Sequence, residues 1–206
     1  DAIKMLVMDH GVEVDSLNGT GNTALISSAR RGRMLSVAAL LRSGAEVDRR
    51  DPKGLTALHH AARGLFSSEG GKYCKTMQLL IDAGADINAL CMRNYTALHE
   101  SCENGQVTQS ILLLRCGARF DLRDIQGHTP LHLAAVKNSN DTLVSILLSC
   151  GASPYTVNYV NGSPMHDAFQ LFPVVGVLSA MQILLDYGAS MQIRNNAGMT
   201  ARDSAV

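Results

Sequence analysis

Tryptophan is absent from this chain of 206 residues, and aromatic residues make up only 4% of it. Large aromatic side chains usually dominate a thick globular core, so their scarcity argues against one. The 46% hydrophobic content comes mostly from Leu, Ala, Val, Ile and Met. This composition suits thin helical layers better than one thick centre.

The chain also lacks a net charge, because 18 Lys and Arg residues balance 18 Asp and Glu residues. Overall neutrality gives no global sign of a nucleic-acid or membrane partner. The longest apolar run, 171–185, is interrupted by Pro173, Gly176 and Gln182 and is too short to span a bilayer. No signal peptide is visible at Asp1. Five cysteines, an odd number, favour a reducing compartment over a disulfide framework, so we expect a cytoplasmic or nuclear location.

A repeated unit accounts for most of the chain, and residues 124–157 (DIQGHTPLHLAAVKNSNDTLVSILLSCGASPYTV) are its clearest copy. The Gly151-Ala152 pair has counterparts that begin at Gly11, Gly44, Gly84, Gly117 and Gly188, at spacings of 33, 40, 33, 34 and 37 residues. The run Thr129-Pro130-Leu131-His132 recurs in the same register, beginning at Thr23, Thr56, Thr96, Ser163 and Thr200. Two markers in register over six copies indicate a repeat array.

Each part of the unit has a predicted structural role. Thr129 and Pro130 suit the start of a first helix, and the apolar residues in 143–148 recur at helical spacing as in a second helix. Gly151 suits a left-handed helix end. One copy cannot bury its own apolar face, so stability must come from stacking.

A period near 33 with a T-P-L-H-x-A core resembles the ankyrin repeat over essentially the whole chain. The resemblance implies an all-α solenoid of stacked helix-turn-helix units with β-hairpin-like connecting tips, acting as a protein-interaction scaffold. The predicted division is a partial repeat at 1–17, repeats at 18–50, 51–90, 91–123, 124–157 and 158–194, and a partial repeat at 195–206. Because both ends fall inside a repeat, we expect a fragment of a longer protein.

Two repeats depart from the pattern. The second carries about seven extra residues within 64–75 (GLFSSEGGKYCK), which predict an exposed loop containing Phe66 and Tyr73. This loop is either a tolerated insertion or a partner-binding flap. The fifth has Phe169 at a small-residue position and extra residues around LFPVVG, within 170–176, so its first helix is expected to be longer or kinked near Pro173.

The histidines offer no convincing catalytic set. His59, His99, His132 and His166 hold one repeat position, so we expect them to hydrogen-bond toward the adjacent turn. His99 and Cys102 could hold half a zinc site, but no second pair has ligand spacing. No GxSxG, Walker, HExxH or GxGxxG motif occurs in a suitable context. We therefore expect no enzyme activity, no metal and no cofactor.

Candidate functional residues lie at the turn tips and just after the first helices, which line the concave face of such a stack. Between residues 18 and 63 there are eight basic residues and three acidic ones. Large apolar residues occupy the later tips. The predicted partner-binding residues are Arg30, Arg31, Arg49, Arg50, Lys53, Arg63, Met92, Arg93, Tyr95, Ile125, His128, Tyr159 and Val160.

Three readings of this surface stay open. The basic end favours an acidic or phosphorylated segment of a protein partner, although it could be only a solvated face. The runs SPMHDA and YTALHESCENG resemble repeats of SOCS-box substrate receptors of ubiquitin ligases. Nucleic-acid binding through the basic repeats is a further alternative, against which the neutral total charge and the lack of interleaved aromatics count.

Asn88, in the run LLIDAGADINAL, is a candidate modification site. Leu80 and Ile87 precede it at the positions seen before hairpin asparagines that a 2-oxoglutarate-dependent hydroxylase modifies in ankyrin proteins. The resemblance therefore implies possible hydroxylation of Asn88.

Overall fold

The computed structural model describes residues 13–64, 70–136, 141–169 and 177–204. Short helices follow one another in pairs, with one pair inside each predicted full repeat, whose bounds remain a prediction. The pairs are α2 (Ala24–Arg30) with α3 (Met34–Arg42), α4 (Ala57–Arg63) with α5 (Gly70–Asp82), α6 (Ala97–Glu103) with α7 (Val107–Arg115), α8 (Pro130–Val136) with α9 (Asp141–Ser149), and α10 (Pro164–Phe169) with α11 (Val177–Asp186). A 3-10 turn, η1 (Arg202–Ser204), follows.

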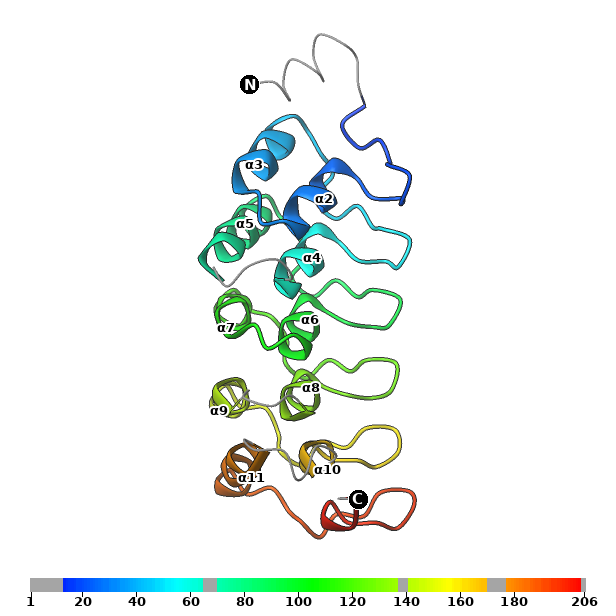
Figure 1. The fold of residues 1–206 in the computed structure, drawn as a ribbon, viewed down its shortest axis with the longest axis vertical. Helices are drawn as coiled ribbons and strands as arrows, with labels where there is room; N and C mark the ends of the chain where they lie inside the picture. Colours follow the sequence, from blue (N-terminus) through cyan, green and yellow to red (C-terminus); the bar gives the residue numbers. More distant parts are fainter. Residues whose placement is uncertain (1–12, 65–69, 137–140, 170–176, 205–206) are drawn as a thin grey trace.

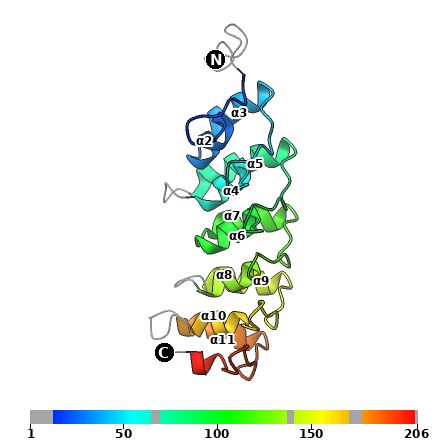
Figure 2. The same ribbon diagram turned by 90° about the vertical axis from the view of Figure 1, so that its right-hand side faces the viewer.

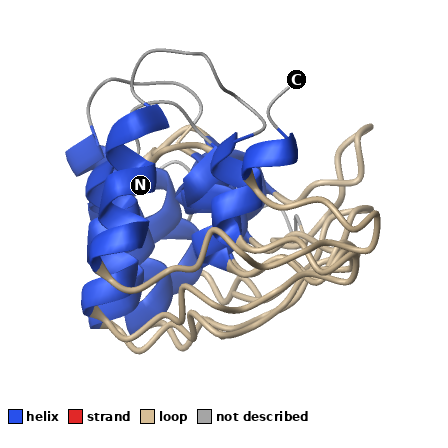
Figure 3. Ribbon diagram, turned by 90° about the horizontal axis from the view of Figure 1, so that it is seen from below, coloured by secondary structure: helices blue, strands red, loops and turns tan. Residues whose placement is uncertain are grey.

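The helices form two parallel columns (Figure 1). The inner helices α2, α4, α6, α8 and α10 pack on one another in chain order, and the outer helices α3, α5, α7, α9 and α11 stack beside them. The result is an elongated stack (Figure 2), from which the connecting loops project on one side (Figure 3). Within the described ranges, strand-type pairing is limited to one isolated bridge between Arg194 and Thr200.

The first helices begin at their threonines as predicted. The Oγ1 atom of Thr23 accepts a hydrogen bond from the Ile26 N–H at 3.2 Å, and Thr96 Oγ1 accepts one from His99 at 3.3 Å. These contacts satisfy N–H groups that a helix start leaves without partners. At the other end of a repeat, Gly151 has a φ of 97°, a left-handed conformation that glycine adopts without steric cost.

Most of the core is one continuous cluster along the stack, and Leu55, Cys91 and Tyr95 form a small second cluster. A single repeat position supplies the centre of the main cluster, since the apolar residue two places after each N-terminal Thr or Ser is almost completely buried: Leu25, Leu58, Leu98, Leu131 and Met165. Small residues such as Ala61 and Ala134, both fully buried, let neighbouring inner helices approach closely. Burial therefore depends on the next repeat.

The insertion in the second repeat differs from the prediction. Residues 70–75 belong to α5, and Tyr73 is only 1% exposed. Its hydroxyl donates to the carbonyl of Arg30 at 3.3 Å, and Gly32 leaves room for its ring. The expected exposed loop is therefore wrong for 70–75, because an amphipathic face places Tyr73 in the core. Phe66 lies outside the described residues.

Some of the remaining expectations concern residues that the structure describes, and others concern residues outside the described ranges. Phe169 is the last residue of α10 and packs against the core, while the region around Pro173 and residues 1–12 lie outside the description. Cys116 and Cys150 are both free thiols. In the described ranges, no helix is both long enough and apolar enough to cross a bilayer.

Candidate functional site

The connecting tips are the most regular feature outside the helices. We define them as 18–22, 51–55, 91–95, 124–128, 158–162 and 195–199. In each tip the first residue donates its N–H to the carbonyl of the fifth, as Asp51 does to Leu55 at 2.9 Å and Asp124 to His128 at 2.9 Å. Side chains reinforce this turn: Asp124 Oδ1 accepts from the N–H groups of Gln126 and His128.

From the third tip onward, each tip is also hydrogen-bonded through its backbone to the tip before it. The Met92 N–H donates to the Lys53 carbonyl at 3.1 Å, and the Ile125 N–H donates to the Arg93 carbonyl at 3.1 Å. The same link joins Tyr159 to Gln126 at 3.0 Å. The tips and the inner helices behind them, which we call the tip face, therefore form one connected surface.

Four of the predicted apolar contact residues are exposed on this surface. The exposed fractions are 71% for Met92, 55% for Ile125, 64% for Tyr159 and 59% for Val160. Because they lie on three tips that are hydrogen-bonded in series, they are held at fixed spacing. Exposed groups of this kind in a fixed arrangement are typical of contact surfaces.

Tyr95 was predicted to belong to this group, and that prediction is wrong. The side chain is only 5% exposed and stacks on the ring of His99. Its hydroxyl donates to Glu103 Oε1 at 3.3 Å, and the Arg93 guanidinium lies 3.9 Å from the ring centre. Burial raises the pKa of Tyr95, with Glu103 adding to the shift. Tyr95 therefore has a role within the fold.

Two predicted cations are held by a buried carboxylate. Glu100 is fully buried in α6, and its Oε1 lies 3.1 Å from Arg93 Nη2 while its Oε2 lies 3.2 Å from Arg63 Nε. Burial raises the pKa of Glu100, and both arginines oppose that rise. Arg63 comes from the preceding repeat, so this triad joins two repeats. Removing either arginine would leave a buried charge poorly compensated.

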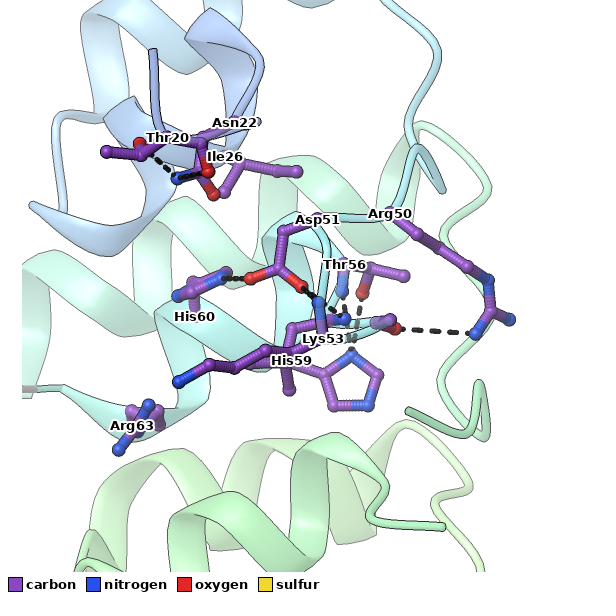
Figure 4. Close-up of polar contacts among 12 residues, drawn as sticks. Thr20, Asn22, Ile26, Arg50, Asp51, Lys53, Thr56, His59, His60 and Arg63 are labelled. Atoms are coloured by element: carbon purple, nitrogen blue, oxygen red, sulfur yellow. Dashed lines mark hydrogen bonds and ion pairs between the residues drawn. The ribbon is translucent and has the colours of Figure 1, made fainter. Parts of the chain in front are cut away.

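The remaining basic residues do not gather at one place. Arg31, Arg49, Arg50 and Lys53 are exposed, and Arg30 is half-buried. Arg49 pairs with Glu46 at 3.3 Å, and Arg50 donates to the Leu90 carbonyl. Figure 4 shows Arg50 extending away from Arg63 and Lys53. The basic end is therefore divided, and Arg30, Lys53 and Arg63 line a common pocket.

His128 was also predicted to contact a partner. Its Nδ1 lies 3.4 Å from Asp124 Oδ2, and its Nε2 lies 3.0 Å from the Asn158 amide of the next tip. The hydrogen bond with Asp124 raises the pKa of His128. The ring therefore connects two tips and is only partly accessible.

The repeated histidines confirm the predicted link to the adjacent turn. Each ring donates from Nε2 to a carbonyl of the following tip, at 3.0 Å for His59 to Tyr95 and 3.3 Å for His99 to His128. Each Nδ1 accepts from the N–H of its own helix cap. Burial lowers the pKa of His59 and His99 to about 4. Their role is structural, and the described residues contain no cluster of three or more metal-ligating side chains.

Asn88 is half-buried, and its side-chain oxygen accepts from the Arg119 N–H at 2.8 Å. It therefore connects the turn after α5 to the turn after α7. This contact is compatible with an unmodified asparagine, and hydroxylation at Asn88 stays a prediction.

His60 is a residue of this surface that the sequence interpretation overlooked. It follows His59, at the position that Glu100 holds in the next repeat and Asp167 holds in the fifth. This column points toward the tips, since His60 Nε2 lies 3.0 Å from Asp51 Oδ2 (Figure 4). Polar residues recurring beside a repeated histidine were the available signal.

Comparison with known proteins supports this description. The chain matches the family described as "Ankyrin repeats (3 copies)" over residues 1–89 and 65–158. It is 37% identical to Ankyrin repeat and SOCS box protein 16 of Homo sapiens over 160 residues, which are 72% of this chain and 35% of that protein. A putative palmitoyltransferase of Danio rerio is 27% identical over 215 residues, covering 88% of this chain and 32% of that protein. The chain thus spans about a third of the length of these relatives.

A solved structure is similar over the whole chain. The ankyrin repeat domain of Bcl-3, described as a member of the IkappaB protein family, superposes with a TM-score of 0.80 at 27% sequence identity. The match covers 100% of this chain and 86% of that domain.

Proposed function

Because the chain belongs to the ankyrin-repeat family, whose repeats generally form a non-catalytic interaction fold, we propose that its tip face binds a segment of a protein partner. The observation that carries the proposal is the series of exposed apolar side chains, Met92, Ile125 and Tyr159, on tips joined by backbone hydrogen bonds. Aromatic and apolar anchors of this kind tend to dominate the energetics of protein interfaces. The domain would carry out no chemistry of its own.

The partner segment would be acidic or phosphorylated near the first repeats. Arg30, Lys53 and Arg63 line one pocket there, and arginine matches the geometry of carboxylates and phosphates. Exposed ion pairs contribute only about 0 to 1 kcal/mol each. The cations would therefore mainly accelerate association, while the apolar tips would slow dissociation.

The test is affinity capture with the chain, followed by kinetics with the captured partner. Tyr159→Ala should increase the dissociation rate at least about tenfold if the side chain is an anchor. Tyr155→Ala is the matched control, because Tyr155 is the same residue type with a similar exposure of 54% but lies outside the tips. Equal effects of the two substitutions would refute a role for the tip face. Nuclease treatment during capture separates a nucleic-acid partner from a protein partner.

A second candidate is the substrate-recognition part of a SOCS-box ubiquitin-ligase receptor. The 37% identity to Ankyrin repeat and SOCS box protein 16 favours it, as do the runs SPMHDA and YTALHESCENG. Sequencing the transcript beyond residue 206 tests it, since a SOCS box must follow the repeats in such a receptor.

A further inference from the structure

A pocket of about 220 Å³ lies between the first two described tips and the inner helices α2 and α4. Its lining combines the cations Arg30, Lys53 and Arg63 with His60 and a single carboxylate, Asp51. Figure 4 shows Lys53, His60 and Arg63 on the same side of the second tip. The pocket therefore has an excess of positive charge in a recess that two repeats share.

Asp51 offsets only part of this positive charge, and its oxygens are already engaged by the turn and by His60. Oδ1 accepts from the N–H groups of Lys53 at 2.8 Å and Leu55 at 2.9 Å, and Oδ2 accepts from His60 Nε2 at 3.0 Å. Among the described residues, the Lys53 ammonium has no carboxylate within ion-pair distance. An incoming anion could therefore pair with Lys53 without displacing Asp51.

Three buried nitrogen atoms around the pocket have no hydrogen-bond partner among the residues that the structure describes: Arg30 Nε, His60 Nδ1 and Arg63 Nε. Arg63 Nε lies 3.2 Å from Glu100 Oε2, close enough for an ion pair but not aligned as a hydrogen bond. His60 is only 5% exposed, so bulk water does not readily solvate its ring. Buried polar groups normally have hydrogen-bond partners, so Arg30 Nε and His60 Nδ1 are the lining atoms most available to a ligand.

We propose that this pocket binds an oxyanion, a carboxylate or phosphate group carried by the partner segment. The inference rests on the proposed function and deepens it by assigning the acidic anchor to one site. Arg30 and Lys53 exceed Asp51 by one positive charge, while Arg63 is balanced by Glu100. That excess matches one carboxylate, and protonation of His60 would match a phosphate dianion.

His60 makes anion binding dependent on pH, because its ring must be protonated to bind the anion. Its Nε2 must carry a proton to donate to Asp51, so Nδ1 of the neutral ring is a lone pair that repels an oxyanion. Binding at Nδ1 therefore requires protonation of the ring. The charged groups that face the ring are Asp51 and Lys53 from the tip, Arg30 from α2 and Arg63 from α4. Burial lowers the pKa of His60, with Asp51 opposing, and a bound oxyanion should raise it.

The experiment follows the His60 ring by NMR in the 206-residue chain while inorganic phosphate or acetate replaces chloride at constant ionic strength. We expect a saturable shift of the His60 resonances and a higher His60 pKa in the bound state. A response to phosphate alone identifies a phosphate site, and a response to acetate as well identifies a general carboxylate and phosphate site. No saturable shift with either anion overturns the proposal.

Matched variants locate the site. Arg30→Gln should weaken the apparent phosphate affinity roughly tenfold, as expected for loss of one charge-assisted hydrogen bond, whereas Arg31→Gln should leave it unchanged because Arg31 is exposed and does not line the pocket. If Arg30→Gln does not fold, Lys53→Gln at the exposed tip provides the same comparison. Equal affinities in the lining variant and Arg31→Gln overturn the assignment. These titrations need no partner, so they can fail or succeed independently of the capture experiment.

Discussion

The histidine of each repeat acts as a two-sided connector. His132 accepts from the Thr129 N–H through Nδ1 and donates through Nε2 to the Gly162 carbonyl of the next tip. Burial lowers its pKa to about 3, with the charge of His128 contributing. Protonation of Nδ1 would break the bond to its own helix cap. The neutral ring is therefore required for the repeat to close on its neighbour.

Acidification should consequently destabilise the array. For His59, His99 and His132 the folded pKa lies well below the ordinary 6.5, so the unfolded chain binds more protons between pH 6.5 and about 4. Stability is then complete above pH 6.5 and falls as the pH falls through this window. By pH 5 the lowered pKa of each histidine should reduce the free energy of unfolding by about 2 kcal/mol. Urea unfolding at pH 7 and pH 5 measures the loss.

Asp167 supplies an internal control with the opposite sign. Burial raises its pKa to about 7, against an ordinary value of 3.8, so the folded state holds a proton that the unfolded chain releases. The raised pKa of Asp167 therefore destabilises the folded state increasingly as the pH rises from 4 to 7. Asp167→Asn should therefore stabilise the chain at pH 8 and have little effect at pH 4. Identical pH profiles for the variant and the parent would contradict the raised pKa of Asp167.

At the scale of the element, each tip is a five-residue turn that the next tip covers closely. Gly127 has a φ of 85°, and a Cβ placed there would lie 2.8 Å from the backbone nitrogen of Tyr159. Gly44 has almost the same φ, 86°, but a Cβ there would meet nothing within 4 Å. Comparing substitutions at Gly127 and Gly44 therefore distinguishes the cost of backbone strain from the cost of a steric clash between tips.

Substitution by alanine should affect the two positions unequally. Gly44→Ala should cost about 1 to 2 kcal/mol, the strain of a left-handed conformation with a side chain. Gly127→Ala should cost more and should weaken the bond from the Tyr159 N–H to the Gln126 carbonyl. Urea unfolding gives the two free energies, and amide hydrogen exchange at Tyr159 reports the bond. Equal losses and unchanged exchange would mean that the tips are not in close contact.

Across the whole molecule, stability is shared between neighbours. Inner helices contact the inner helices before and after them, and the core continues without interruption along the stack. The Glu100 triad adds a polar connection between the second and third repeats. Local contacts of this kind make the free energy of unfolding roughly a sum over repeats and interfaces.

Removal of residues 158–206 should therefore leave a folded but weaker array. The fragment 1–157 keeps α2 to α9 and loses the packing of α10 on α8 and of α11 on α9. Circular dichroism should show helical content in proportion to length, and the urea midpoint should be lower than that of the parent chain. A fragment that is unfolded where the parent is stable would contradict additive stacking.

The repeated elements of this protein could be predicted from its amino-acid sequence alone. Two markers in register located the helix pairs, the threonine caps and the left-handed glycines, because these depend on contacts within about four residues. The histidine column was also predictable, since a residue repeated at every unit must serve the unit. Periodicity likewise placed Met92, Ile125 and Tyr159 at tips.

The side-chain contacts within and between repeats became evident only in the folded structure. It buried Tyr95 against His99 and Tyr73 against Gly32, and it joined Arg63 and Arg93 to Glu100. It also separated Arg50 from the pocket that contains Arg30 and His60. A period identifies equivalent residues but does not state which side chains meet, because contacts such as Tyr73 with Gly32 and Arg63 with Glu100 join different repeats. The basic residues of this segment therefore form a candidate binding site only where the fold brings their side chains together.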